Sequence, residues 1–198
     1  PLNGIIGLSS FLIGSSDLDA KTIQEFATGI FESGNRLHET IKKFIYYTEV
    51  ELLIDNPQKS NMLQSEVVKY GNIFLIKACK LISEKHNRNA DIIINSDPFN
   101  MKISLSHFEI ILNNIIDNAF KFSDNGEKVK VDVTKEDELI NITIQDNGIG
   151  IDENKINEIT AFGQFDRDKM EQQGIGLGLI TSKKLIEFYG GTFSLTKN

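Results

Sequence analysis

The sequence predicts an α+β fold, in which an N-terminal antiparallel helical hairpin is followed by a mixed region of helices and strands. A seven-residue apolar repeat runs from about residue 21 to residue 53 and is typical of a long helix in a bundle. Apolar and polar residues alternate at 128–134 and 139–145, which predicts two strands. The polar connection Lys135–Glu138 has the length of a hairpin loop.

The segment Asp55–Pro57 separates these two regions, because proline interrupts a helix. We therefore predict one domain at residues 1–55 and a second at residues 56–198. A chain of 198 residues is long enough to bury a substantial core.

The composition narrows the class of protein. A hydrophobic content of 40% and a charged content of 25% are ordinary for a soluble globular protein. The net charge of −7 argues against nucleic acid or an anionic membrane surface as the main partner. Cys79 is the only cysteine, which excludes an internal disulfide, and its apolar neighbours predict a buried thiol. We found neither a membrane-spanning apolar run nor a secretory signal, and expect a cytoplasmic location, with any membrane anchor in domains outside this chain.

The N-terminal region is expected to contain two helices. Residues 1–14 place apolar side chains at helical spacing, and residues 21–53 form the long seam. Two helices alone cannot bury such a seam, so we expect a homodimer that closes a four-helix bundle.

The second region is expected to alternate between helices and strands. The predicted elements are, in order, a strand at 60–63, a helix at 65–85, strands at 91–95 and 101–104, a helix at 106–123, the two strands of the hairpin, a helix at 177–189 and a final strand after Gly191.

The helix at residues 106–123 carries two stripes. We expect its apolar stripe to face the core; its members are Phe108, Ile111, Leu112, Ile115, Ala119 and Phe122. Asn114, Asn118 and Lys121 form a polar stripe that could bind a hard cation and a phosphate. A solvated polar face is the alternative. Ser106 with Glu109 reads as a capping box, although Ser104 could also cap the helix.

The second candidate motif is Asp146–Gly150, DNGIG, at the end of a predicted strand. An ionised carboxylate only accepts hydrogen bonds, so Asp146 could select a ligand edge with an amino group, such as adenine N6. Gly148 and Gly150 would let the backbone approach a flat ring. Ordinary turn chemistry is the alternative.

The third candidate motif is Gly174–Leu179, GIGLGL, which runs into a helix. Free N–H groups at such a helix start can bind phosphate, although many helix entries use glycine for packing alone. The motif lacks the Lys-Ser/Thr ending of a P-loop. Phe162 and Phe165 precede it in a polar run and could anchor a movable lid, or form a small satellite cluster.

Together and in this order, the motifs resemble those of sensor histidine kinases of two-component signalling. NIIDNAFKFS at 114–123 resembles the N box, DNGIG the G1 box, Phe162–Phe165 the F box and GIGLGL the G2 box. PLNGIIG at the start resembles the stretch that follows the H box. The F box departs from the family by having Gly163-Gln164 where an acidic residue and proline are common.

The resemblance implies a dimerisation and phosphotransfer domain at residues 1–55, followed by a catalytic, Bergerat-type α/β sandwich with a mixed β-sheet. It implies that Asp146 binds adenine, that Asn118 binds Mg²⁺ near Asn114, and that Lys121 lies against the phosphates of ATP. The other implied ATP-binding residues are Phe122, Gly148, Gly150, Phe162, Phe165, Gly174, Gly176, Leu177 and Gly178.

The family's phosphoacceptor histidine would lie upstream of Pro1, and none of His38, His86 and His107 is suitably placed to replace it. We therefore expect a truncated piece, with its last strand also missing, that binds nucleotide but cannot phosphorylate itself. The parent protein is expected to transfer the γ-phosphoryl of ATP to histidine and then to a response-regulator receiver domain. The alternatives are a nucleotide-binding pseudokinase and, less well matched, a chaperone- or topoisomerase-like ATPase.

Overall fold

The computed structural model describes residues 1–54, 56–148, 150 and 177–196. It divides into two compact units, Pro1–Thr48 and Glu49–Asn198. The predicted domain boundary after residue 55 remains a prediction. No helix within the described ranges combines the length and the apolar character needed to cross a bilayer.

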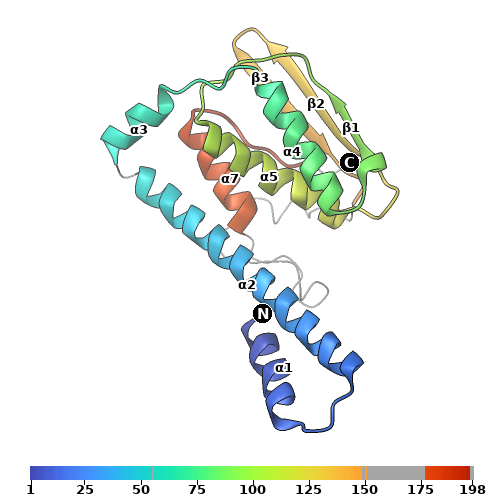
Figure 1. Cartoon of the computed structure of the whole chain (residues 1–198). Helices are drawn as coiled ribbons and strands as arrows, with labels where there is room; N and C mark the ends of the chain where they lie inside the picture. The colour runs from blue at the N-terminus through green and yellow to red at the C-terminus, as the bar shows by residue number, and fades with distance from the viewer. Residues whose placement is uncertain (55, 149, 151–176, 197–198) are drawn as a thin grey trace. The chain divides into compact units, whose positions relative to one another are not determined.

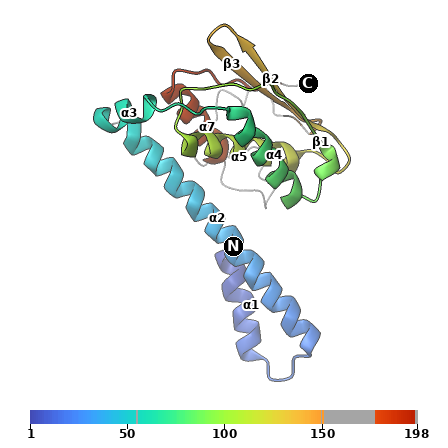
Figure 2. The ribbon, with the colours of Figure 1, turned by 45° about the horizontal axis from the view of Figure 1, so that its top comes forward.

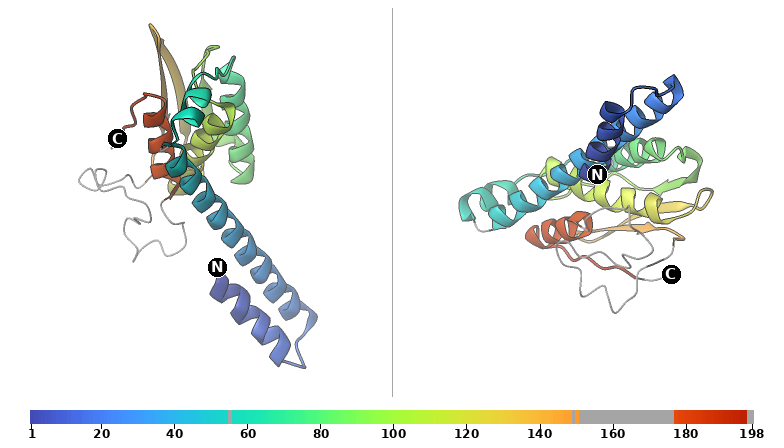
Figure 3. Two further views of the ribbon diagram at one scale, coloured as in Figure 1. Left: turned by 90° about the vertical axis from the view of Figure 1, so that its left-hand side faces the viewer. Right: turned by 90° about the horizontal axis from the view of Figure 1, so that it is seen from below.

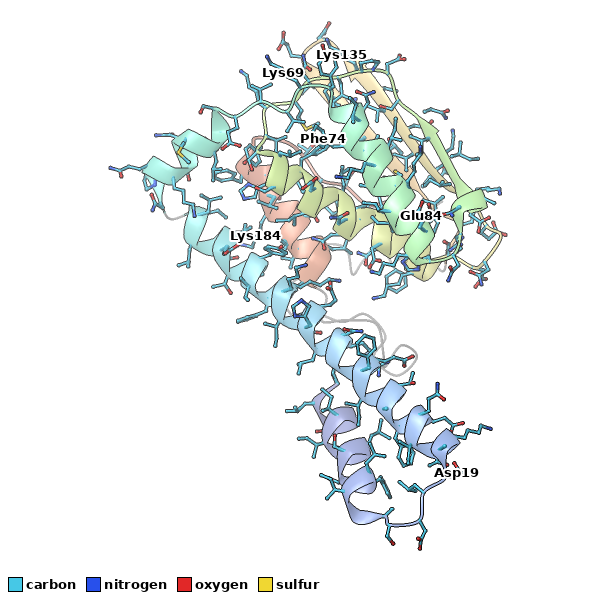
Figure 4. The ribbon with its side chains drawn as sticks, viewed as in Figure 1. Asp19, Lys69, Phe74, Glu84, Lys135 and Lys184 are labelled. Atoms are coloured by element: carbon cyan, nitrogen blue, oxygen red, sulfur yellow. The ribbon has the colours of Figure 1, made fainter. Side chains whose placement is uncertain are left out.

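The first unit is a helical hairpin, as predicted. Helix α1 spans Leu2–Gly14, and helix α2, Ala20–Ile54, runs back along it (Figures 1 and 2). Asp19 caps α2, because its Oδ1 accepts a hydrogen bond of 2.6 Å from the Thr22 N–H (Figure 4). The helices pack closely: a Cβ on Gly29 would lie 2.6 Å from Leu8 Cδ1.

The second unit contains the end of α2 and an α/β lobe. Its helices are α3 (Pro57–Gln64), α4 (Gly71–Lys85), the short η1 (Asn89–Asp91), α5 (Leu105–Phe122) and α7 (Leu177–Phe188), and its strands are β1 (Ile92–Asn95), β2 (Val129–Glu136) and β3 (Leu139–Gln145). Helices α4 and α5 form a layer on one face of the sheet, and α7 packs beside α5 (Figures 1 and 3).

The sheet is mixed, as predicted, with the order β1-β2-β3. Strand β1 pairs with β2 in parallel, with Ile92 opposite Val129, and β2 pairs with β3 antiparallel, with Val131 opposite Ile144. The hairpin loop is shorter than expected, because the strands extend to Glu136 and restart at Leu139. Asp137 in the remaining loop adopts a left-handed φ of 52°.

The core lies between this sheet and helices α4 and α5. Its fully buried members include Leu75, Cys79, Phe108, Leu112, Ile116, Val129 and Val131. Burial raises the pKa of the Cys79 thiol to about 12, which agrees with the predicted buried cysteine.

The buried face of helix α5 is wider than the predicted apolar stripe. Ile116 and Phe120 are buried at 0% and 2% exposure, whereas Ile115 and Phe122 are only partly buried. Of the two predicted caps, the structure has Ser104, whose Oγ accepts a hydrogen bond of 3.5 Å from the His107 N–H, and not the Ser106 capping box.

Four other predictions for this region were wrong. Residues 60–63 belong to helix α3, because Asn56 caps it and Pro57 takes the first helical position. Helix α4 begins at Gly71 and not at residue 65, because Val68 bridges Met101 and Tyr70 adopts a left-handed φ of 54°. That bridge is all that forms of the predicted strand at 101–104, and residues 192–196 are not assigned as a strand.

The end of α2 and helix α3 contact α7 within the second unit. Lys184 lies on α7 (Figure 4), and its Nζ forms an ion pair of 2.7 Å with Glu51 Oε1. Gln64 Nε2 of α3 donates a hydrogen bond of 2.6 Å to the carbonyl of Phe188. Helix α7 is therefore held from both α2 and α3.

Candidate nucleotide-binding site

Helix α5 is the element that brings the predicted site residues together. The partly buried Asn114 lies at its contact with α7, where its Nδ2 donates to Ser182 Oγ over 3.4 Å. A Cβ on Gly178 would lie 3.3 Å from Asn114 Oδ1. Gly178 therefore lets the first turn of α7 approach the polar stripe of α5.

The Asp146–Gly148 turn lies at the C-terminal end of α5. The Gly148 N–H donates a hydrogen bond of 2.9 Å to Asp146 Oδ1, which orients the carboxylate. A side chain on Gly148 would overlap the carbonyl oxygen of Phe122. The turn thus lies directly against the last residue of the helix, and only glycine permits that approach.

Asn118 and Lys121 lie on α5 between these two contacts, and both are partly buried. Asn118 follows Asn114 by one helical turn, and Lys121 follows Asn118 by nearly one more. The described site residues therefore line the C-terminal half of α5, from its contact with the start of α7 to its contact with the Asp146–Gly148 turn. Gly150, just beyond that turn, has a positive φ of 69°.

Helix α7 begins at the residue where the sequence predicts a helix start. Leu177 begins the helix and is 1% exposed, and Ser182 Oγ donates a hydrogen bond of 2.9 Å to the Gly178 carbonyl. The predictions for Phe162, Phe165, Gly174 and Gly176 fall outside the described residues.

Sequence reasoning missed a second set of polar residues beside the site. Arg88 is 5% exposed, and its guanidinium bonds the end of α5 and the loop that follows. Asn147 Nδ2 donates a hydrogen bond of 2.9 Å to Glu127 Oε2 in that loop. Arg88 lies in a polar stretch of sequence, which gave no signal that its side chain would be buried.

The arrangement suits a flat base and a polyanion. Asp146 presents an acceptor at one end of α5, Lys121 supplies positive charge on the same helix, and α7 begins next to Asn114. An acceptor, a cation and a helix N-terminus are the groups that bind an amino-bearing ring and phosphates.

Comparison with known proteins agrees with this chemistry. Residues 104–198 match the family described as histidine kinase-, DNA gyrase B-, and HSP90-like ATPase. The sensor protein GacS of Pseudomonas syringae pv. syringae is 30% identical over 202 residues, which cover 96% of this chain and 21% of GacS. This chain contains the ATP-binding domain of a sensor histidine kinase.

Solved histidine kinases share the fold. AdeS of Acinetobacter baumannii aligns with 100% of this chain over 89% of its own length, with a TM-score of 0.64 and 17% identity. Full-length ShkA, solved in complex with AMPPNP, matches 100% of this chain and 41% of its own, with a TM-score of 0.62 and 20% identity. The predicted α+β fold and the resemblance to sensor histidine kinases are confirmed.

Proposed function

We propose that the whole protein transfers the γ-phosphoryl of ATP to a histidine and then to an aspartate of a response regulator, and that this chain binds ATP with Mg²⁺. The observation that carries the proposal is the contact of Gly148 with the Phe122 carbonyl. It joins the turn that would bind adenine to the helix that would bind the phosphates.

The base would bind at the Asp146–Gly148 turn. Asp146 would accept a hydrogen bond from the adenine amino group, and its carboxylate is already oriented by the Gly148 N–H at 2.9 Å. Gly148 and Gly150 would leave the ring room to approach, with Phe122 beside it.

The phosphates and Mg²⁺ would bind along α5 and the start of α7. Asn118 would supply an amide oxygen to Mg²⁺, which typically takes only one or two protein oxygens and fills its shell with phosphate and water. Asn114 would lie close to the metal, and Lys121 would neutralise phosphate charge. Gly174, Gly176, Leu177 and Gly178 would flank the phosphates, and Phe162 and Phe165 would anchor the lid.

These residues would contribute positioning and charge neutralisation, which are most of what phosphoryl transfer requires of a protein. Bound Mg²⁺ would offset charge on the transferred group. The half-buried setting of Asn118 and Lys121 would strengthen both interactions relative to bulk water.

The partners would be a second copy of the chain and a receiver domain. Large apolar side chains exposed on α1 and α2 support dimerisation through the N-terminal helices; they include Ile6, Phe11, Phe31, Ile41, Phe44 and Ile45. We expect the chain to act in the cytoplasm, with any membrane anchor in other parts of the parent.

Calorimetry with ADP and GDP tests the base site. Asp146→Asn replaces an acceptor with a donor against the adenine amine, so the dissociation constant for ADP should rise by about tenfold or more. Guanine carries an acceptor at the same edge, so the preference for ADP over GDP should shrink. Asp137→Asn, in the β2–β3 loop, removes the same charge elsewhere and should leave both constants unchanged. Equal constants for Asp146→Asn and wild type would refute the assignment.

Asn118→Asp tests the metal site. The variant keeps an oxygen ligand but adds negative charge beside the phosphates, so ATP affinity should change strongly with Mg²⁺ present. Titration with and without Mg²⁺ measures this, and an unchanged Mg²⁺ dependence would show that Asn118 does not bind the ion.

A further inference from the structure

Arg88 lies outside the nucleotide motifs but is bonded to the end of the helix that carries one of them. Its Nη1 donates to the Phe120 carbonyl at 2.9 Å, the Ser123 carbonyl at 2.9 Å and Ser123 Oγ at 3.0 Å. Its Nη2 donates to the Glu127 carbonyl at 2.6 Å. A single side chain thus binds carbonyls on both sides of Phe122 and in the following loop.

The position suits a cation. The last carbonyls of a helix have no partner within it and lie at the negative end of the helix dipole. Arg88 meets them with a planar set of donors, and its guanidinium carbon lies 5.0 Å from the centre of the Phe120 ring. The guanidinium therefore caps α5 from another element of the fold.

Asp91 completes the arrangement. Its Oδ2 accepts from Arg88 Nε at 2.9 Å and from the Gly126 N–H at 3.0 Å, and its Oδ1 lies 3.5 Å from Lys128 Nζ. The Arg88–Asp91 pair thus holds the loop between α5 and β2 through four of its residues, and Arg88 also holds the end of α5 through the Phe120 carbonyl; the four are Ser123, Gly126, Glu127 and Lys128.

The same loop contacts the proposed adenine site. Asn147 Nδ2 donates to Glu127 Oε2 at 2.9 Å, and the Arg88 guanidinium binds the carbonyl of that same Glu127. Gly148 packs on the Phe122 carbonyl, which lies in the chain between the Phe120 and Ser123 carbonyls that Arg88 holds. Displacement of Arg88 would therefore disturb the Asp146–Gly148 turn in two ways, through the Glu127–Asn147 hydrogen bond and through the Phe122 carbonyl.

We propose that Arg88, fixed by Asp91, is a positioning residue for nucleotide binding, which holds the C-terminus of α5 in register with the Asp146–Gly148 turn. This inference rests on the proposed function, since it assumes that ATP binds where these two segments meet. Lysine is no substitute, because an ammonium group cannot present five coplanar donors.

Binding of ATP to Arg88→Lys tests the proposal. We expect the dissociation constant to rise about tenfold while the circular dichroism spectrum stays that of the folded protein. Ser123→Ala removes one acceptor of Arg88, together with the bond that Ser123 Oγ donates to the Ala119 carbonyl, and should raise the constant by a smaller factor. The control is Leu75→Ala, a fully buried residue in the first half of α4, which should lower thermal stability yet leave the constant within twofold of wild type.

Amide NMR shifts without nucleotide separate positioning from general destabilisation. The shifts of Lys121, Phe122 and Gly148 should move in Arg88→Lys and stay in place in Leu75→Ala. Equal shifts, or equal loss of affinity, in the two variants would overturn the proposal. If Arg88→Lys does not fold, Ser123→Ala decides by the same comparison. If the wild type itself binds no ATP, the proposed function fails, and the amide shifts still decide whether Arg88 positions the turn.

Discussion

Gly148 occupies a position where even a methyl group would meet backbone atoms. A Cβ there would overlap the carbonyl of Phe122 and lie 2.7 Å from Asp146 Oδ1. A flexible side chain could move away from such a contact, but a helix carbonyl cannot without disturbing its helix. The glycine is therefore required by the packing of the turn on α5, independently of any ligand.

Gly148→Ala should consequently lower both stability and affinity. We expect a loss of about 1–3 kcal/mol in the free energy of unfolding, typical of overpacking, and at least tenfold weaker ADP binding as the turn moves off α5. Chemical denaturation and calorimetry measure the two effects. Gly7→Ala is the control, since a Cβ at this helical position meets no atom within 4 Å and should be tolerated.

The Asp91 carboxylate predicts an acid-sensitive stability. Hydrogen bonds from Arg88 and then from the Gly126 N–H hold the pKa of Asp91 below its ordinary value. Its stabilising contribution is therefore complete above the unfolded pKa of about 4 and is lost as the pH falls through the folded value. Urea unfolding at several pH values below 5 should show a smaller loss in Asp91→Asn than in wild type. If the free energy of unfolding fell equally with pH in Asp91→Asn and wild type, the assigned role of the Asp91 carboxylate would be contradicted.

The sequence revealed the side chains that could bind a ligand, but not the side chains that fix their positions. Asp146, Gly148, Asn114 and Gly178 could be selected from their motifs. Asn114 lies on α5, Gly148 and Gly178 pack against that helix, and Asp146 is bonded to Gly148. Arg88 could not, because its acceptors are mostly backbone carbonyls, which no side-chain pattern encodes.

Helix α5 buries more of its surface than its apolar periodicity predicts. The predicted stripe included Ile115 and Phe122, but the buried set contains Ile116 and Phe120 instead. The helix contacts α4, α7 and β3, so it buries more than the single face that a surface helix would bury.

Truncation of neighbouring isoleucines tests this assignment. Ile116→Ala should lower the free energy of unfolding by about 2–5 kcal/mol, because the residue is 0% exposed and its loss leaves a cavity. Ile115→Ala, at a partly buried position, should cost less than half as much and serves as the matched control. Thermal or urea unfolding measures both, and equal losses would mean that the core follows the predicted stripe.

The wrong elements share a cause. Short segments around residues 60 and 101 were assigned strands from brief apolar patterns, which do not distinguish a strand from a helix turn or a bridge. The long, strongly periodic elements were predicted closely, since α2, α5 and the β2–β3 pair each contain several repeats. Capping by Asn56 and Pro57 was the available signal for α3.

For the whole molecule, the apolar face of the N-terminal helices predicts the oligomeric state. Ile41 and Ile45 are one turn apart on α2, and each is about half exposed, at 50% and 49%. Monomeric proteins rarely leave such a run uncovered, whereas a second copy would bury it.

The double variant Ile41→Glu with Ile45→Glu should therefore convert a dimer into a monomer. Light scattering after gel filtration gives the mass, and ATP binding should persist because these residues lie in the first unit and the nucleotide motifs in the second. Lys42→Glu, an exposed neighbour on the same helix, should remain dimeric. A monomeric wild type would contradict the expected homodimer.

The single cysteine has a practical consequence for experiments on this chain. The thiolate is the nucleophile that reacts with thiol reagents, and Cys79 combines zero exposure with a pKa of about 12. In the folded protein Cys79 should not react with maleimides at neutral pH. A dye or spin label attached to one engineered surface cysteine would then report from that place alone, with the native background left intact.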